Sequence, residues 1–445
     1  MSQGRWSRLI LSRRRVVTYV VVILVLLLLR VVADLWAGSH LASVKARLAP
    51  IYNGLDVASL APPAIRPAEN RARVLAAAAA LVVGDSSALG GALSTFSVSP
   101  KDPVKRDAVL RKAVADNRAA LQVLDEAESR PKSNWDITYR DGPRLRVPSL
   151  MEIRNLENVN TAAGLVDLAD GRPDEAVRRV RLGVVLGASM AQESVLIVQL
   201  IRFAVTRTAY QLLQNVLSTG EPSAVALRTL QVPLDDEANR ASIVTGLIGE
   251  LKLQSSLLDG VESGRQSVGD TGVVDHPLDR VRFARTAEAC LAWCLRPGVR
   301  VVHAHLLEQL HQFVEYARLQ PFERQARSLR RPSEEPQPWW WRLAPGSFTA
   351  AWDGLGRANE SGDEQRALAT LAATSVALRR CRLDRGSYPA SLDELVPAFL
   401  PRVLADPYTG RPPEYKRDGS GFELRVIPEQ NADGTRGLLD WRMAR

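Results

Sequence analysis

The sequence predicts a mainly α-helical protein with one N-terminal transmembrane helix, an irregular all-α helical-hairpin domain and a small α+β domain at the C-terminus. Three observations support this prediction. A charge-free apolar run begins at Val16, apolar residues recur with helical spacing over residues 67–330, and turn residues followed by alternating apolar positions mark the C-terminal end. With 445 residues, the chain is long enough for two or three domains.

Residues 1–15 form a basic segment that we expect to stay in the cytoplasm. Its arginines are Arg5, Arg8, Arg13, Arg14 and Arg15. They supply five positive charges of the formal net charge of +9, so the rest of the chain carries a net charge of 9 − 5 = +4. That remaining charge is mixed with acidic residues and forms no stripe with aromatics, which argues against a nucleic-acid groove.

Residues 16–38 are predicted to be a transmembrane signal anchor. Val16–Leu29 carries no charge, but as a helix it rises only about 21 Å, less than the roughly 30 Å of a hydrocarbon core. The span is long enough if it continues to Trp36 and Arg30 extends its charge toward the nearer interface. The basic N-terminal flank places the bulk of the chain on the periplasmic side of a bacterial inner membrane.

A cleavable signal peptide is the alternative, because it also has a basic start and a short apolar region. Leu35 and Trp36 stand where a cleavage site needs small residues, so we favour an uncleaved anchor. In both cases the residues that follow are exported.

Residues 39–66 are predicted to be a linker, with a short polar helix followed by a semi-rigid proline spacer. Residues 67–330 then form the α-helical domain, in which Gly, Pro and Asp separate the helices. The predicted helices are Ala68–Val83, Pro103–Ser129, Leu150–Ala169, Pro173–Met190, Glu193–Leu217, Leu234–Leu258, Leu278–Leu295 and Val299–Leu329.

One pair of these helices has a recognisable turn. Gly171 can end the first helix with a positive φ, and Pro173 can open the second at its first turn. Small residues at Gly164, Ala176 and Gly183 allow close packing, and the pattern resembles a single tetratricopeptide-type hairpin. The large aromatics and the proline of that family are missing, and no second copy follows at its period of 34 residues. We therefore predict irregular hairpin packing, with a repeat array as the alternative.

A second linker, residues 331–346, is rich in proline and charge. It contains Trp339, Trp340 and Trp341, and three consecutive indoles cannot all face one side of a helix. They predict either a contact with a membrane interface or a partner, or packing that holds the linker against the helical domain. We favour packing against the helical domain.

The C-terminal domain, residues 347–445, is predicted to contain a long helix, a short helix and a small antiparallel sheet. Gly386 ends the long helix, and Ser391 with Glu394 forms a capping box for the short one. The sequence DPYTG at 406–410 predicts a turn, and strands follow on either side of an RDGSG hairpin.

These motifs resemble the globular part of the major pseudopilin of bacterial type II secretion. The matching residues are Leu383-Asp384-x-Gly386-x-Tyr388-Pro389, Leu392-x-x-Leu395, Asp406-Pro407-x-x-Gly410 and Asn431-x-Asp433-Gly434. The resemblance covers only about residues 363–440.

Two departures limit what this resemblance implies. A pseudopilin has its membrane helix directly before this fold, whereas here it lies over 300 residues upstream. Gly4 is also not followed by the glutamate of a prepilin-peptidase site, so we do not expect filament assembly. The whole chain looks like uncharacterised membrane-anchored bacterial envelope proteins with a helical domain and a pseudopilin-like tail.

Histidine and cysteine give little sign of catalysis. His303, His305 and His311 lie on one predicted helix, but their spacing does not place all three on one face; Glu308 and His311 share a face and are too few for a metal site. We expect hydrogen-bonded or solvent-facing histidines, and no catalytic residue is predicted. The cysteines, Cys290, Cys294 and Cys381, are predicted to be small core residues, with a disulfide between two of them as the alternative.

No cofactor is predicted firmly; the one candidate is a calcium ion in the loop EQNADGTRGLLD, for which we favour a solvated polar hairpin over a metal site. Its candidate ligands are Glu429, Asn431, Asp433, Thr435 and Asp440. Their spacing is close to that of a twelve-residue calcium loop, and the resemblance to major pseudopilins implies calcium in this region.

The sequence therefore predicts a non-enzymatic, membrane-anchored envelope protein that acts as a scaffold or interaction partner, for example in a secretion or pilus-like machine. The membrane and envelope proteins are its expected partners, and nucleic acid is not. The alternative is an exported enzyme whose active site cannot be recognised from the sequence.

Overall fold

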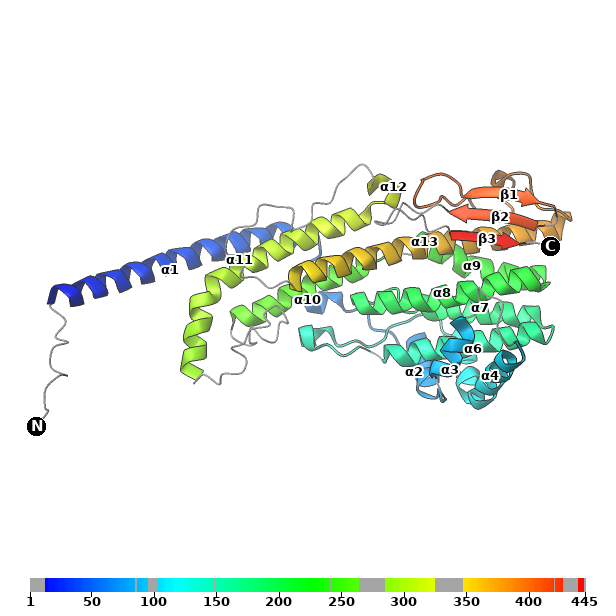
Figure 1. Ribbon diagram of the computed structural model, residues 1–445, viewed down its shortest axis with the longest axis horizontal. Helices are drawn as coiled ribbons and strands as arrows, with labels where there is room; N and C mark the ends of the chain where they lie inside the picture. The colour runs from blue at the N-terminus through cyan, green and yellow to red at the C-terminus, as the bar shows by residue number, and fades with distance from the viewer. Residues whose placement is uncertain are drawn as a thin grey trace, which may run out of the picture. The chain divides into compact units, whose positions relative to one another are not determined.

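The computed structural model in Figure 1 describes residues 13–84, 86–94, 103–147, 149–240, 242–263, 285–324, 347–419, 421–426 and 439–443. Within these residues the chain is mainly α-helical, which confirms the predicted fold class. Three short strands near the C-terminus form one antiparallel sheet.

The helices keep their chain order in the labels of Figure 1. They are α1 (Arg13–Leu48), α2 (Arg71–Ala80), α3 (Ser86–Ser94), α4 (Pro103–Asp116), α5 (Arg118–Glu126), α6 (Leu150–Ala169), α7 (Pro173–Ala188), α8 (Leu196–Thr219), α9 (Ala224–Arg240), α10 (Val244–Glu262), α11 (Arg285–Arg318), α12 (Pro321–Arg324) and α13 (Ser347–Arg385). The strands are β1 (Glu414–Asp418), β2 (Gly421–Val426) and β3 (Leu439–Met443).

The described residues divide into two compact units. The first combines the described parts of Met1–Ser59, Leu251–Gln312 and Pro336–Phe348. The second combines those of Leu60–Glu250, Phe313–Glu335 and Thr349–Arg445. The predicted linker at 331–346, with its three tryptophans, lies outside the described residues.

Helix α1 changes its surroundings along its length. From Val16 to Leu29 its side chains are exposed, as expected if lipid rather than protein surrounds them. From Ala37 onward one face is buried, and Leu41, Val44 and Leu48 are at most 5% exposed. Because these positions recur every three or four residues, they form one packed stripe within the first unit.

The second unit is built around the hairpin of α6 and α7. Gly171 has a φ of +73°, and Pro173 opens α7, so the turn forms as its residues predict. An added Cβ at Gly183 would lie 2.8 Å from the Ala209 Cβ on α8, and one at Gly187 would lie 2.2 Å from the Thr206 Cγ2. The small residues of α7 therefore allow α8 to pack closely against it.

The C-terminal motifs also form as predicted. Ser391 and Glu394 make a complete capping box, and the Asp406 carboxylate accepts a hydrogen bond of 2.8 Å from the Tyr408 amide. The sheet has the order β1-β2-β3, with Phe422, Leu424 and Val426 of β2 all buried. The rings of Tyr388 and Phe422, 5.0 Å apart, join the segment after α13 to this sheet.

Several helix boundaries differ from the prediction. The helix expected over Pro103–Ser129 breaks at Asn117, whose side-chain amide bonds to the Val83 backbone N–H and C=O at 2.7 and 2.9 Å. Two helices expected before and after Pro297 are joined in α11. Cys381 is buried as predicted, but Cys294 is exposed, so its expected place in a core was wrong.

Candidate functional site

The predicted calcium loop lies almost entirely outside the described residues. This applies to Glu429, Asn431, Asp433 and Thr435. Asp440 is on β3, where it is the register partner of Arg425 on β2. The calcium site therefore remains a prediction.

The histidines of α11 have separate partners. His311 Nδ1 lies 2.7 Å from the Tyr52 hydroxyl, and Glu308 accepts a hydrogen bond of 2.6 Å from Arg47. These two neighbours on α11 thus contact different residues rather than a common ligand. His303, by contrast, is fully buried and belongs to a polar cluster that the sequence did not reveal.

This cluster joins α10 and α11 in the first unit. Asp259 and Glu262 are three residues apart on α10 and so share a face of that helix. The Nδ1 atom of His303 lies 3.0 Å from Glu262 Oε1 and 3.8 Å from Asp259 Oδ1. The other ring nitrogen, Nε2, lies 3.0 Å from the Ser255 hydroxyl. Both nitrogens of the buried imidazole therefore have polar neighbours.

Two basic side chains complete the cluster. Lys45 Nζ lies 2.5 Å from Asp259 Oδ1, and Arg300 Nε lies 3.3 Å from Glu262 Oε2. Burial alone would raise the pKa of Glu262, but the hydrogen bond from His303 and the nearby basic groups outweigh it, so the pKa lies below its ordinary value. Glu262 is therefore ionised in the folded protein at neutral pH.

Asp259, Glu262 and His303 are the described residues best placed to hold a metal ion. Their ligand atoms all lie within 4.8 Å of one another, and ligands around a tetrahedral divalent ion are about 3.3 Å apart. However, the charges of Lys45 and Arg300 already balance the two carboxylates. A metal ion would have to displace Lys45, so the arrangement as it stands is better suited to fastening α1 to α10 and α11.

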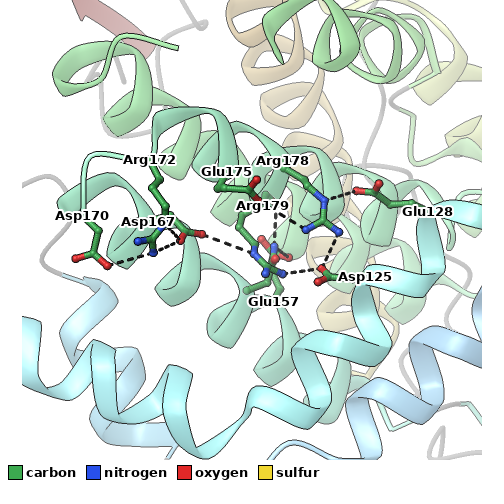
Figure 2. A network of polar contacts seen from close by, with 10 residues as sticks. Asp125, Glu128, Glu157, Asp167, Asp170, Arg172, Glu175, Arg178 and Arg179 are labelled. Atoms are coloured by element: carbon green, nitrogen blue, oxygen red, sulfur yellow. Dashed lines mark hydrogen bonds and ion pairs between the residues drawn. The ribbon is translucent and has the colours of Figure 1, made fainter. Parts of the chain in front are cut away.

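A second polar network lies on the hairpin of the second unit (Figure 2). Arg178 Nη2 and Arg179 Nη1 approach the same oxygen of Asp125 on α5, at 3.1 and 2.9 Å. At the turn, Arg172 lies between Asp167 and Asp170, with N–O distances of 2.7 and 3.1 Å. Because these acids and bases neutralise one another, the network fastens α5, α6 and α7 together.

Beside this network lies a fully enclosed acid, Glu157 of α6, which is 1% exposed. Its carboxyl oxygens accept hydrogen bonds from the Asn160 amide at 3.2 Å and the Thr161 hydroxyl at 3.1 Å. Burial raises its pKa to about 8, against these hydrogen bonds. No ion pair to Glu157 is found within the described part of the chain, so a neutral carboxyl fits its surroundings.

A further buried acid, Glu193, organises the loop before α8. It accepts hydrogen bonds from the Trp135 amide at 2.9 Å and the Tyr139 hydroxyl at 2.8 Å. That hydroxyl in turn accepts one of 2.9 Å from the Ser194 amide. Burial raises the pKa of both Glu193 and Tyr139. Glu193, Tyr139 and Trp135 are buried, so these groups hold a loop in place rather than form an open site.

The second unit also contains a small cavity of about 210 Å³ between α3, α4, α6 and the segment 82–84 that follows α2. Its lining includes Val83, Leu89 and Asn117, together with Lys112 and Asp116. The two charged residues pair with each other at 2.7 Å. Cavities that hold small-molecule ligands are usually 300 Å³ or more, so this one is small for a substrate.

No protein-family model, curated protein or solved structure matches the chain. Its function must therefore be argued from its own residues.

The sequence did contain one signal of the His303 cluster, the acidic pair Asp259 and Glu262 on one helical face. It did not show that α10 pairs with α11, which brings His303 to this pair.

Proposed function

We propose that this chain is a single-pass membrane protein whose bulk lies outside the cytoplasm, where it acts as a scaffold or interaction partner in the bacterial envelope. The observation that carries the proposal is α1. It is the one described helix long and apolar enough to cross a membrane, and its most apolar part has no buried residue. Leu24 and Leu28, for example, are 59% and 63% exposed, which is unfavourable in water.

The continuity of α1 supports an uncleaved anchor. The helix runs without a break from Arg13 to Leu48, and its second half packs into the first unit. Cleavage near residue 38 would remove Asp34, which lies 3.1 Å from Arg300 of α11. The five arginines before the span support an orientation in which the N-terminus stays in the cytoplasm.

A scaffold is favoured over an exported enzyme because two acids whose pKa is raised, Glu157 and Glu193, are enclosed and the described cavity is small. Glu157 and Glu193 are each at most 1% exposed and bond to neighbouring side chains or backbone. The pseudopilin-like tail suggests a secretion or pilus-like machine as the setting. The resemblance of the tail to pseudopilins is the basis for proposing this setting. The proposed calcium ion in the 429–440 loop rests on the same resemblance.

Two measurements test this proposal. A reporter fused after Arg445 should behave as exported, and cytoplasmic behaviour would contradict the orientation. A photo-crosslinking amino acid at Val225 or Val232, which are 71% and 66% exposed on one face of α9, tests the scaffold role in intact cells. A discrete adduct with an envelope protein is expected. If these and other exposed positions give none while α1 spans the membrane, the scaffold role is wrong.

A further inference from the structure

The start of α11 exposes apolar side chains beside the membrane anchor. Trp293 and Leu295 are 43% and 47% exposed, and Cys294 between them is exposed as well. Large exposed apolar groups on consecutive residues are unfavourable in water and indicate a surface that something else covers. We call residues 293–295 the α11 foot.

Pro297 explains why the α11 foot contacts Arg30. Proline has no backbone N–H, so Pro297 cannot donate the helical hydrogen bond to the C=O of Trp293, four residues earlier. Arg30 of α1 supplies the missing donors, because its Nε lies 3.0 Å from that oxygen and its Nη2 also bonds to it. The guanidinium carbon lies 4.0 Å from the centroid of the Trp293 ring, in cation–π geometry. Figure 1 shows α11 bent in this region.

The two helices run in the same direction from this contact. Arg30 meets Trp293, Asp34 meets Arg300 at 3.1 Å, and Arg47 of α1 meets Glu308 further along α11 at 2.6 Å. An added Cβ at Gly38 would lie 2.8 Å from Arg300 Nη1, so the small residue leaves room for this guanidinium beside α1. Residues 293–308 of α11 therefore lie along residues 30–47 of α1, starting at the outer end of the apolar span.

The length of the span gives the depth of this contact. The arginines end at Arg15, and about 20 helical residues are needed to cross 30 Å of hydrocarbon, which brings the span from Val16 to about Leu35. Arg30 is then roughly 7 Å inside the boundary, at 1.5 Å per residue. The α11 foot contacts the guanidinium of Arg30, which also pairs with Asp34 one turn nearer the boundary, so the foot lies between this depth and the boundary.

We propose that the α11 foot inserts into the same bilayer leaflet as the outer end of α1, with lipid as its partner. This inference rests on the membrane anchor proposed above. Tryptophan is favoured at the membrane interface, and Leu295 would add apolar contact with the acyl chains. In that setting the Trp293 carbonyl, a backbone acceptor that lipid cannot satisfy, is bonded by Arg30, whose charge also pairs with Asp34 at 3.6 Å. The protein thus contacts the membrane at two places, one spanning and one inserted.

Cys294 provides a native position for testing this proposal. The full-length chain carrying Cys290→Ser and Cys381→Ala would be labelled with a nitroxide at Cys294 and reconstituted into phospholipid vesicles. Its collisions with oxygen, which concentrates in lipid, and with a water-soluble nickel chelate would be measured. Two further variants in the same full-length chain, with Cys294→Ser added, give the reference values. They are Leu24→Cys for the span and Gln312→Cys, exposed on α11, for water.

The oxygen-to-nickel ratio at Cys294 should lie below that at Leu24→Cys, near the bilayer centre, and several-fold above that at Gln312→Cys. A ratio equal to that of Gln312→Cys, with Leu24→Cys in lipid, would overturn the α11 foot and leave the anchor intact. Aqueous values at both positions would overturn the anchor as well. Trp293→Asp should lower the ratio at Cys294 several-fold, whereas Val225→Asp, a matched change on exposed α9, should not. An unchanged ratio in Trp293→Asp would also count against insertion.

Discussion

Replacing Glu157 by Gln should abolish a dependence of stability on pH. The carboxyl is 1% exposed and bonds to Asn160 and Thr161. Glutamine has nearly the same shape, can accept from the Asn160 amide and can donate to the Thr161 oxygen. The substitution therefore keeps the packing and removes only the ionisation.

The sign follows from the raised pKa. Burial brings the pKa of Glu157 in the folded protein to about 8, from 4.5 for the unfolded chain. Between these values the folded state holds more protons than the unfolded state, so stability is greatest below pH 4.5 and falls as the pH rises to 8. The slope is about 1.4 kcal/mol per pH unit, or roughly 5 kcal/mol over the whole interval.

The assay is the unfolding of full-length wild type and Glu157→Gln in detergent at pH values from 5 to 8.5. Near pH 5 the two proteins should differ by less than about 1 kcal/mol, whereas at pH 8 the variant should be more stable by several kcal/mol. Glu152→Gln, an exposed change on the same helix, is the matched control and should follow the wild type. If the unfolding free energies of wild type and Glu157→Gln change in parallel with pH, Glu157 is not a neutral carboxyl in the folded protein.

Four other changes test separate parts of the molecule. Arg202→Met leaves its buried partner Glu237, at 2.5 Å, without a counter-charge and should lower the unfolding free energy by about 3–5 kcal/mol. The control Arg207→Met breaks an exposed ion pair and should lower it by less than about 1 kcal/mol. Gly187→Ala should lower the unfolding free energy by about 1–3 kcal/mol, since its Cβ would overlap Thr206, and wild-type stability would show that α8 can move away. Lys45→Met removes the cation beside Asp259, so zinc should raise the melting temperature of that variant more than that of the wild type. An equal rise in the two melting temperatures would count against metal binding at His303. Millimolar calcium should raise the melting temperature of the wild type but not of Asp433→Ala, and equal melting temperatures with calcium and with a chelator would remove calcium from the tail.

Local signals in the sequence predicted local structure well. The turn at Gly171 and Pro173, the capping box of Ser391 and the Asp406 turn each depend on residues within five positions of one another. Their geometry is fixed by backbone sterics and short-range hydrogen bonds, which the sequence displays directly. The apolar span of α1 was equally visible.

Long-range packing was not predictable in the same way. Helix α13 begins at Ser347, through a stretch with Gly354, Gly356 and Gly362 that helical propensity alone disfavours. At Gly362 an added Cβ would lie 3.1 Å from the Ile243 Cβ, so at that position the absence of a side chain permits close approach. Tertiary packing outweighs propensity here, and the partner, Ile243, lies 119 positions away in the sequence.

The same limit applies to the candidate sites. Nothing near His303 in the sequence indicates Asp259 or Glu262, which come from a different helix, and nothing near Arg30 indicates the carbonyl of Trp293. Pro297 does show that one carbonyl of α11 needs a partner. Only the fold shows which donor reaches it.

The unbroken course of α1 has a mechanical consequence. Its exposed span and its packed stripe from Ala37 to Leu48 belong to one helix, with no flexible tether between them. If α1 spans the membrane as proposed, the twelve residues after Trp36 carry the far end of that stripe about 18 Å along the helix from the membrane surface. A protein on a disordered tether samples many heights and orientations, whereas a continuous helix would hold the first unit within a narrow range of both. A partner anchored in the same membrane would then meet this unit at a defined height.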